Sequence, residues 1–313
     1  RSAPGPCRRG SCAAPGFRER LSTMQRYEFR CFHRLRVRWV EVDMQKIVFN
    51  AHYLMYIDTA MMDYWRALAL PYEASMEVLG GEMYVKKATV EYHASAILDD
   101  TLDVALRCAR MGNSSVLFQT GIFRGDQRLI EGELVYVFAD PATQTSRPVP
   151  AALRKLLTDY EAGHPVVTAQ VGTWSALGKD AARVRQEVFV QEMGVALEEE
   201  SDGQDATAVH AVLHNALDMP VAAGRLLPSV AGVARIERLA VDRSLRGAGW
   251  GSMLLDALVQ AAQERGDSRV ALDAQASAQA FYQRAGFAVC GAPFMEAGLQ
   301  LVPMERALSS QLA

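Results

Sequence analysis

The sequence predicts an α+β protein of two domains, and three observations indicate this class. A length of 313 residues exceeds the usual size of a single domain. The first half contains one long apolar helix followed by strands that are joined by hairpin turns, which is typical of an α+β layer arrangement. The second half alternates strands and helices in a different order, so the halves are not duplicates of each other.

The break between the halves falls at Gly163-His164-Pro165, where the periodic pattern stops. We therefore expect a leader over residues 1–26, a first domain over 27–162, a linker over 163–167 and a second domain over 168–313. The leader is rich in Arg, Gly, Pro and Ser and has no apolar period. We expect it to be disordered, with the natural start near Met24, and its basic composition also allows a transit peptide.

Composition excludes several classes of function. Half of the residues are hydrophobic and the net charge is −3, so the chain has enough apolar material for two cores. A pI near 6.1 predicts no basic surface for nucleic acid or an anionic membrane, and no apolar run reaches the length of about 18 residues that spans a bilayer. The five cysteines are an odd number without metal-ligand spacing. We expect reduced thiols, no metal site and a cytoplasmic location.

The first half is predicted to begin with a strand over Glu28–Val42, an irregular loop and a helix over about Ala51–Ala69. That helix has little polar face, so it must be covered on most sides. Gly112-Asn113 and Gly125-Asp126 predict hairpin turns, and a short helix over Ala151–Glu161 closes the domain. The strands between these signals are predicted at Glu82–Ala94, Asp100–Met111, Ser114–Arg124 and Gln127–Asp140.

The second half is predicted to be a sheet with interspersed helices. Its predicted helices are Lys179–Gln191, Ser252–Gln263 and Ser277–Ala285, the last of which is capped by Gly286. Its predicted strands are Val166–Trp174, Ala208–Leu213, Val221–Leu227, Arg235–Val241, Arg269–Ala274, Phe287–Cys290 and Leu299–Glu305.

The most informative segment is Arg246-Gly247-Ala248-Gly249-Trp250-Gly251, which lies between a predicted strand and a predicted helix. The first N–H groups of a helix have no partner inside the helix and lie at the positive end of its dipole. Glycines let an anion approach the backbone closely, and Arg246 adds a positive charge. The segment therefore predicts a phosphate-binding turn, although it lacks the Gly-Lys-Ser/Thr of a nucleotide P-loop. An ordinary strand–helix connection is the alternative interpretation.

This segment fits R/Q-x-x-G-x-G/A and resembles the pyrophosphate loop of the GNAT acyl-CoA N-acyltransferase superfamily. Residues 278–287 resemble the A-x-x-F-Y-x-x-x-G-F pattern of that family, and residues 184–192 with 202–210 look like one bacterial branch of it. The resemblance covers about residues 168–307 and implies a mixed sheet flanked by helices. It implies that pantetheine binds along Leu239, Ala240 and Val241 and that pyrophosphate binds Arg246, Gly247, Ala248, Gly249, Trp250 and Gly251.

Amine attack on a thioester needs a neutral amine and a donor beside the departing sulfur. Tyr282 matches the family position of that donor, and its alternative role is packing on an amphipathic helix. Glu237 on the motif strand is the best candidate for the base, acting through water. A strand carboxylate also commonly pairs with neighbours such as Arg235 or Arg238. His210 is expected to be a structural residue, on a strand that faces the same region.

Residues 36–53 are the second informative block. They resemble the opening of hotdog-fold thioesterases of the 4-hydroxybenzoyl-CoA thioesterase type, in which an aspartate ends the first strand and an apolar loop leads into a long central helix. The rest of residues 28–162 follows in order, including Asp99-Asp100, Gly112-Asn113 and Glu131-Gly132-Glu133. The resemblance implies a long helix wrapped by an antiparallel sheet. It also implies side-by-side dimers that often pair further, so we expect a homodimer or homotetramer.

Thioester hydrolysis needs an attacking oxygen and a polarised carbonyl. Asp43 is the candidate nucleophile or base, and its alternative role is a loop or N-cap carboxylate. Free N–H groups near residues 47–51 are expected to act as an oxyanion site, and Asn50 is expected to orient the carbonyl or the water. The family pattern is D-x-x-G, whereas Lys46 occupies the glycine position. We expect either a different loop or some backbone strain there.

Together these patterns predict a bifunctional enzyme, an acyl-CoA thioesterase fused to an N-acyltransferase. Acetyl-CoA or another acyl-CoA is its expected substrate, no cofactor is tightly bound and the acceptor amine is unidentified. Two alternatives stay open at this point. In the first alternative, the second half is an acyl-CoA-binding module that regulates the thioesterase. In the other, the first half hydrolyses acyl carrier protein thioesters.

Overall fold

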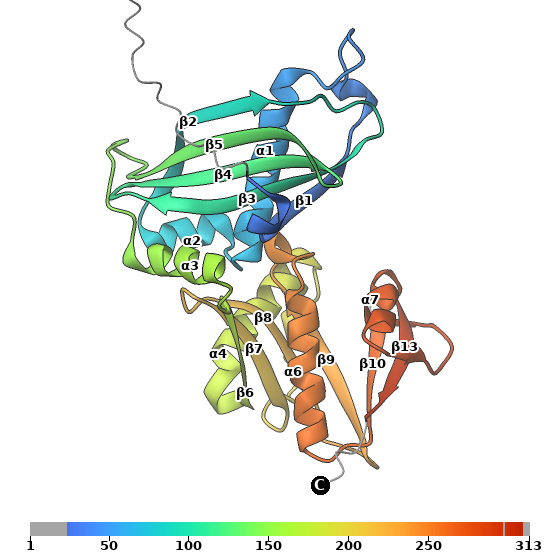
Figure 1. Cartoon of the computed structure of the whole chain (residues 1–313). Coiled ribbons are helices and arrows are strands. Elements are labelled where there is room, and N and C mark those ends of the chain that lie inside the picture. Colours follow the sequence, from blue (N-terminus) through green and yellow to red (C-terminus); the bar gives the residue numbers. More distant parts are fainter. Residues whose placement is uncertain (1–23, 297, 309–313) are drawn as a thin grey trace, which may run out of the picture.

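The chain folds into two sheets, one in each half (Figure 1). The structure is a computed structural model that describes residues 24–296 and 298–308. The predicted leader therefore lies outside the described residues except at its end. There Met24 is already buried in a small cluster with Phe29, Ala105 and Phe123. None of the helices in the described residues has the length and hydropathy of a membrane span.

The N-terminal sheet has five antiparallel strands in the order β1-β3-β4-β5-β2. The turn at Gly112-Asn113 is confirmed, since the Gly112 N–H donates to the Ser115 carbonyl at 2.7 Å. The helix α3 (Ala151–Ala162) follows the sheet and ends at Gly163, which has a φ of +87°. The strands are β1 (Cys31–Arg36), β2 (Glu82–Tyr92), β3 (Thr101–Met111), β4 (Ser115–Arg124) and β5 (Gln127–Ala139).

The long helix α1 (Asn50–Ala67) crosses behind this sheet (Figure 1). One face of it is buried in the core, through Tyr53, Tyr56, Ile57, Ala60, Met61, Tyr64 and Trp65. The prediction that α1 is covered on most sides is wrong for a single chain. Leu54, Met55 and Met62 are exposed on its other face, because the sheet and the helices after it cover only one side.

The C-terminal sheet has eight strands, of which β12 lies off the main path β11-β13-β10-β9-β8-β7-β6. All of its pairs are antiparallel except β9 with β10. The strands are β6 (Val167–Thr173), β7 (Val209–Asn215), β8 (Pro220–Leu226), β9 (Val233–Val241), β10 (Arg269–Gln275), β11 (Ala288–Val289), β12 (Phe294–Glu296) and β13 (Leu299–Ala307).

Two helices pack on opposite faces of this sheet because side chains alternate along each strand. Ala211 and Leu213 of β7 lie in the cluster that includes α6 (Trp250–Glu264), whereas Val212 lies in the cluster with α4 (Trp174–Arg185). A third helix, α7 (Gln279–Arg284), precedes β11 and ends at Gly286, which has the predicted left-handed φ of +84°.

Several predicted boundaries are wrong, for local reasons. The strand predicted over Glu28–Val42 stops at Arg36, because the Glu41 carboxylate accepts bonds from the Arg38 main chain and side chain and folds residues 39–41 into a 3₁₀ turn. The helix predicted from Lys179 begins at Trp174 and continues as a π-helix over Gln186–Glu192. The sequence analysis did not predict α2 (Tyr72–Leu79), α5 (Leu197–Glu200) or the short strand β12.

The two halves share one continuous hydrophobic core cluster. It includes residues of α1 and the N-terminal sheet together with residues of α6 and the C-terminal sheet. The side-chain amide of Asn215, at the end of β7, donates to the Ala69 carbonyl just after α1 at 2.8 Å. Asn215 is buried, so this bond forms part of the junction between the halves.

Candidate active sites

The predicted phosphate-binding turn connects the end of β9 to the start of α6. The φ angles of Gly247 and Gly249 are +88° and +94°, in the left-handed region. A Cβ at either position meets no atom within 4 Å. Backbone conformation rather than crowding therefore requires glycine here. Residues 246–249 are exposed, and α6 begins directly after them at Trp250. The N–H groups of the first turn of α6 thus lie next to an open loop.

Arg246 is not free in this turn. Its guanidinium donates to both carboxylate oxygens of Glu192 at 2.6 Å and to the Val241 carbonyl at 3.1 Å. The bonds from Arg246 lower the pKa of Glu192, although burial opposes them. The positive charge that the sequence assigned to this turn is therefore already matched by a carboxylate. Glu192 lies 54 positions away in sequence, so no local pattern indicated the pair.

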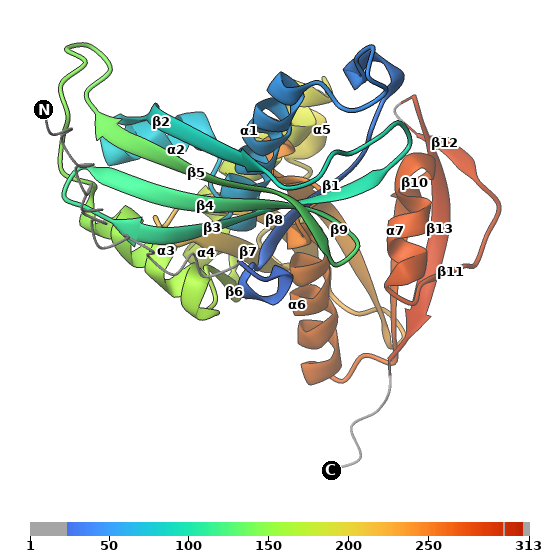
Figure 2. The ribbon, with the colours of Figure 1, turned by 45° about the horizontal axis from the view of Figure 1, so that its top comes forward.

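The strand before the turn diverges from its parallel neighbour. β9 pairs with β10 only over Val233–Arg235, and Figures 1 and 2 show β10, β13 and α7 separating from the rest of β9. Beyond Arg235 the β10-facing edge of β9, which includes Leu239, Ala240 and Val241, has no strand partner within the described chain. Unpaired main-chain donors and acceptors of this kind can bind an extended ligand as an added strand.

A β-bulge in β9 reinforces this divergence. Ala223 of β8 pairs with Ala240, whereas Arg225 pairs with Glu237, so β9 has one extra residue in this stretch. Arg238 lies in the bulge and has a φ of +52°, in the left-handed region. A bulge bends the strand and leaves a residue without its ladder partner. The bulge therefore falls just before Leu239, at the start of the predicted pantetheine-binding segment.

Tyr282 lies in α7 between two aromatic rings, 4.8 Å from Phe281 and 5.9 Å from Phe287, measured between ring centroids. Burial raises the pKa of Tyr282 to about 12, so its phenol stays protonated at neutral pH. The neighbouring Phe281 joins α7 to the glycine turn, because a Cβ on Gly251 lies 3.6 Å from the Phe281 ring and from Val241. Phe281, the residue before Tyr282 in α7, thus packs next to the end of β9 and the start of α6.

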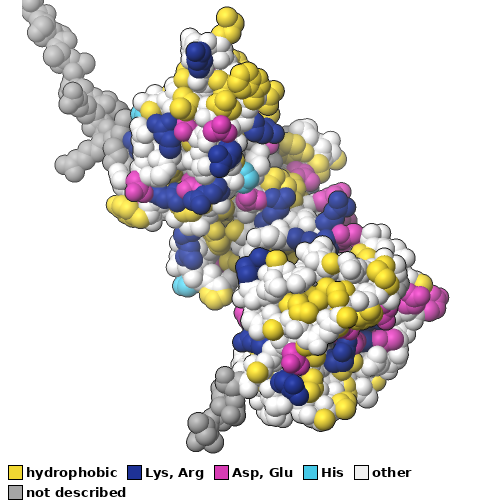
Figure 3. Space-filling view, turned by 90° about the vertical axis from the view of Figure 1, so that its right-hand side faces the viewer, with side chains coloured by type: hydrophobic (Ala, Val, Ile, Leu, Met, Phe, Trp, Pro, Cys, Tyr) yellow, Lys and Arg dark blue, Asp and Glu magenta, His cyan; other side chains and the backbone are white. Residues whose placement is uncertain are grey.

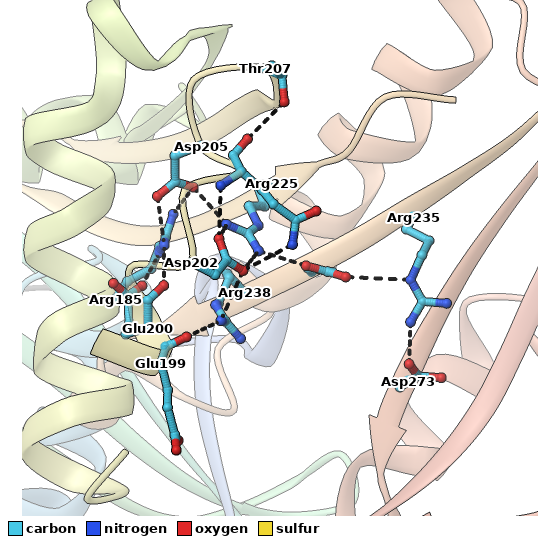
Figure 4. Close-up of polar contacts among 12 residues, drawn as sticks. Arg185, Glu199, Glu200, Asp202, Asp205, Thr207, Arg225, Arg235, Arg238 and Asp273 are labelled. Carbon is cyan, nitrogen blue, oxygen red and sulfur yellow. Dashed lines mark hydrogen bonds and ion pairs between the residues drawn. The ribbon is translucent and has the colours of Figure 1, made fainter. Parts of the chain in front are cut away.

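Glu237 belongs to a network of ion pairs that includes Arg225 and Arg235, both labelled in Figure 4. Its carboxylate accepts a bond from Arg225 at 2.8 Å, and Arg235 lies 3.5 Å away. The sequence analysis had named Arg235 and Arg238 as alternative partners and did not identify Arg225, which is fully buried. The network continues from Arg225 through Asp205 to the buried Arg185, which also binds Glu200.

The same network fixes charges in the core of the C-terminal half. The bond from Arg225 lowers the pKa of Asp202 well below its usual range, and this effect outweighs burial. His210 is fully buried, with its Nε2 3.0 Å from the Asp205 carbonyl and its ring against Trp174. Burial lowers the pKa of His210, which favours the neutral ring. His210 therefore packs inside the domain and does not line an open surface.

Asp43 lies in a tight hairpin rather than at the end of a strand. Val42 bridges to Val48, and the Asp43 N–H donates to the Ile47 carbonyl at 2.9 Å. One carboxylate oxygen of Asp43 accepts the Gln45 N–H at 2.7 Å. Lys46 follows with a φ of +63°, so it adopts the left-handed conformation that glycine adopts without cost. Of the two expectations for this position, a different loop or some backbone strain, the positive φ corresponds to backbone strain.

The hairpin leads directly into α1, whose first residue is Asn50. Two of the candidate oxyanion N–H groups are already used, since Val48 donates to the Ala96 carbonyl and Phe49 to the Glu41 carbonyl. The first-turn N–H groups of Asn50 and Ala51 have no partner inside the helix. Within the described residues no hydrogen bond joins Asp43 to Asn50. Both residues reach the surface, and large apolar side chains nearby are also exposed, including Trp39, Met44 and Phe49.

Glu41 supports this hairpin and was not predicted from the sequence. It is buried and accepts the Tyr56 hydroxyl at 2.7 Å, in addition to its bonds from Arg38. Burial alone raises the pKa of Glu41, but these bonds outweigh it and hold the pKa below its ordinary value. In the sequence, Glu41 alternates with valines in the same way as Asp43, so the pattern did not indicate that its side chain is buried. Its partner Tyr56 lies 15 positions away and meets it only in the fold.

Two family models match the chain. The Acetyltransferase (GNAT) domain matches residues 177–308, and the Thioesterase superfamily matches residues 45–131. The uncharacterized N-acetyltransferase YjcF of Bacillus subtilis is 39% identical over 127 residues, which are 40% of this chain and 89% of that protein. The acyl-CoA thioester hydrolase YbgC of Escherichia coli is 28% identical over 123 residues, which are 38% of this chain and 89% of that protein.

Among solved structures, Escherichia coli ElaA is similar to part of the chain. It is 28% identical with a TM-score of 0.41, and the match covers 45% of this chain and 99% of that protein.

Proposed function

We propose that the chain, which belongs to the GNAT acetyltransferase family through its C-terminal half and contains a thioesterase superfamily domain before it, is a bifunctional enzyme acting on CoA thioesters. The observation that supports this most strongly is the open glycine turn between the diverging strand β9 and the first turn of α6. Such a turn suits the pyrophosphate of CoA, and the free edge of β9 suits its pantetheine arm. Acyl-CoA is then a substrate, and no tightly bound cofactor is needed.

In the proposed acyl transfer, the amine nitrogen attacks the thioester carbonyl and the C–S bond breaks. Glu237 takes a proton from the amine through water, and the guanidinium groups of Arg225 and Arg235 fix the orientation of its carboxylate. Tyr282 donates a hydrogen bond to the departing thiolate, which leaves as CoA thiolate and takes its proton from solvent. Because burial raises the pKa of Tyr282 to about 12, its phenol is protonated and able to donate this hydrogen bond when the thiolate leaves.

The pair between Arg246 and Glu192 has a place in this proposal. Arg246 already binds a planar anion with two short bonds, the same geometry with which arginine binds phosphate oxygens. We propose that Glu192 holds Arg246 at the edge of the glycine turn before CoA binds. The pyrophosphate then takes over one of these bonds, while the contact of Arg246 with the Val241 carbonyl keeps its side chain in place.

In the proposed hydrolysis, Asp43 activates a water molecule or attacks the thioester carbonyl directly. The developing oxyanion binds the N–H groups of Asn50 and Ala51 at the start of α1, and the Asn50 amide orients the carbonyl or the water. The products are a carboxylic acid and free CoA. The bond from the Gln45 N–H leaves the second carboxylate oxygen of Asp43 available for this chemistry.

We further propose that the enzyme is a homodimer or homotetramer assembled through the thioesterase half. β2 lies at one edge of its sheet, and Val85 and Tyr92 on that strand are more than half exposed. The apolar face of α1 with Met55 is also uncovered, and Figure 3 shows exposed hydrophobic side chains on this half. A second copy that covers this face also encloses the exposed apolar loop around Asp43.

We place the enzyme in the cytoplasm, since Cys31, Cys108 and Cys290 are free thiols.

The test is the release of free CoA from a series of acyl-CoA thioesters, measured with and without a pool of primary amines. The proposal predicts release without amine, and faster release together with acylated amine when the pool is present. Saturable CoA binding without transfer to any amine would instead indicate that the C-terminal half is a regulatory binding module. Preference for thioesters linked to acyl carrier protein over CoA thioesters would indicate the other alternative.

A further inference from the structure

One residue of the thioesterase half, Arg66, binds both ends of the glycine turn in the acyltransferase half. Its Nε donates to the Ser244 carbonyl at 2.9 Å, just before the turn. Its own carbonyl accepts the indole N–H of Trp250 at 3.0 Å, at the first residue of α6. Figure 1 shows the upper end of α6 meeting the lower end of α1. These two bonds therefore enclose the four exposed residues 246–249 between them.

Arg66 is itself held in place by its own half. Its Nη1 donates to Asp63 at 2.5 Å, and the other oxygen of Asp63 lies 2.6 Å from Nδ1 of His33 on β1. The main chain after it is fixed by the bond from the buried Asn215 to the Ala69 carbonyl. The end of α1 is thus bound by side chains from both halves, and it forms a rigid support.

The glycine turn needs such a support. No side-chain packing surrounds Gly247 or Gly249, since a Cβ at either position meets nothing within 4 Å. Glycine also loses more conformational freedom on ordering than any other residue. Donors that are fixed before the ligand arrives bind it more tightly, because the ordering cost is already met. Fixing Ser244 and Trp250 restricts both ends of the turn.

We propose that Arg66 is a positioning residue for the pyrophosphate-binding turn of the acyltransferase half. The thioesterase half then supplies part of the framework on which the acyltransferase binds CoA. This inference rests on the proposed function of the turn. Arg66 touches no reacting atom in it and acts only through Ser244 and Trp250. The contact also gives a physical reason for joining the two enzymes in one chain.

Removing the Arg66 side chain is a mild change for the fold. The side chain is 39% exposed and lines an open pocket of about 530 Å³ on the thioesterase half, together with Met62, Trp65 and, from the other half, Ser244. Methionine at this position keeps the aliphatic stem and loses the donor. Arg66 also lies 16 positions after Asn50 in α1, which is about 24 Å at 1.5 Å per residue. Hydrolysis at the Asp43 hairpin is therefore expected to stay unchanged.

The test compares Arg66→Met with the wild type on two acyl donors, acetyl-CoA and S-acetylpantetheine, which lacks the pyrophosphate. The inference predicts a rise of about five- to tenfold in KM for acetyl-CoA, with kcat within about twofold, since one hydrogen bond to the turn is lost. Values for S-acetylpantetheine are expected to stay unchanged. Arg66→Lys should recover part of the affinity, and Trp250→Phe should raise KM for acetyl-CoA in the same way.

Arg147→Met is the matched control. Arg147 also bridges to a main-chain carbonyl, that of Gly80 at 2.8 Å, but within the thioesterase half. Arg147→Met should leave KM and kcat unchanged with both acetyl-CoA and S-acetylpantetheine. The inference is overturned if Arg66→Met lowers kcat/KM equally for both donors, or if KM for acetyl-CoA does not change. If the wild type transfers no acyl group and Gly249→Glu leaves CoA binding intact, the proposed function itself fails. Transfer that depends on Gly249 but not on Arg66 rejects only this inference.

Discussion

Both candidate sites are loops that lead into the first turn of a long helix, but they reach this geometry with different residues. The acyltransferase turn uses Gly247 and Gly249 at positive φ before α6. The thioesterase hairpin uses Lys46 at positive φ before α1. One loop is bare main chain, and the other presents a carboxylate, Asp43. We propose that the first loop binds an anion and that the second activates a nucleophile.

The two sites also differ in how much of their surroundings one chain supplies. The glycine turn is supported by Arg66 at the end of α1 and by Phe281, which lies next to Gly251. Its neighbouring strand edge is open for an extended ligand. The Asp43 hairpin instead stands among exposed apolar side chains such as Trp39 and Met44. We infer that the first site is complete within one chain, whereas the second is completed by another copy.

The largest effect is expected from Asp43→Ala, which should lower acyl-CoA hydrolysis by about 10²- to 10⁴-fold, because it removes the proposed nucleophile or base. Acyl transfer should not change. Release of free CoA without amine measures the first activity, and amine acylation measures the second. Asp140→Ala is the control, since Asp140 also accepts turn N–H groups, from Ala142 and Thr143, and should keep activity. If Asp43→Ala hydrolyses acyl-CoA at the wild-type rate, the nucleophile or base is another residue.

Tyr282→Phe should lower kcat for acyl transfer by about 10²-fold with little change in KM, because the donor to sulfur is lost while the ring packing stays. The pKa of Tyr282 is raised to about 12, so the proton on its phenol is retained well above its ordinary pKa of 10 and is lost only as pH rises through about 12. Transfer by the wild type should therefore show no loss from this group up to pH 10. Unchanged turnover in the variant removes Tyr282 from the mechanism.

Gly249→Ala should raise KM for acyl-CoA by roughly tenfold, because the new methyl group strains a left-handed residue and stands where the phosphate approaches. Gly266→Ala is a close control. Gly266 follows the other end of α6, has a φ of +88° and is equally open. The two variants should lose similar stability, on the order of 1 kcal/mol, while only the first loses affinity. Equal KM values for the two would contradict a binding role for the turn.

One buried group in each half should make opposite contributions to stability in mild acid. Burial lowers the pKa of His210, so its contribution to stability is present above pH 6.5 and is lost as pH falls through its folded pKa. Burial raises the pKa of Glu161, so the protonated carboxyl is favoured in the folded chain. Its contribution to stability is present at low pH and is lost as pH rises through its folded pKa. Because the two halves share one hydrophobic core cluster, both groups act on the unfolding of the whole chain. Between pH 7 and 5 the His210 contribution should lower the unfolding temperature by a few degrees. His210→Phe should flatten this slope in thermal unfolding curves, and Glu161→Gln should make it steeper.

The smallest effect is expected at Lys46. Lys46→Gly should stabilise the N-terminal half by up to about 1 kcal/mol, since glycine adopts positive φ without steric cost, although its greater freedom in the unfolded chain offsets part of the gain. Thermal unfolding at constant pH measures this effect, and hydrolysis should be unaffected. A lower unfolding temperature would mean that the Lys46 side chain makes stabilising contacts that outweigh the strain.

The parts that the sequence predicted are those in which one residue type satisfies a local demand. The glycine turn around Gly249 and the hairpin turn at Gly112-Asn113 were predictable from their residue types, the first because a bare backbone admits an anion and the second because such residues favour a turn. For Lys46 the sequence left two expectations open, a different loop or a strained backbone, because lysine stands where glycine is expected. Two sheets and their helices follow from such local signals and from apolar periodicity.

The parts that the sequence did not predict depend on partners far along the chain. Arg246 meets Glu192 across 54 positions, and Arg66 meets Ser244 across 178 positions. Neither pair has a local pattern, because a charged residue on a helix or loop is ordinarily solvated. The same holds for Arg225, which the sequence left as an arginine in a strand and which is fully buried against Glu237.

The central claim is that each half binds CoA, one of them through the main chain around Gly249. Isothermal titration of CoA into the full-length wild type and into Gly249→Glu tests it directly. The account predicts binding to the wild type and the loss of one class of sites in the variant, while the heat from the thioesterase half persists. No CoA binding by the wild type, or identical titrations for both proteins, would contradict it.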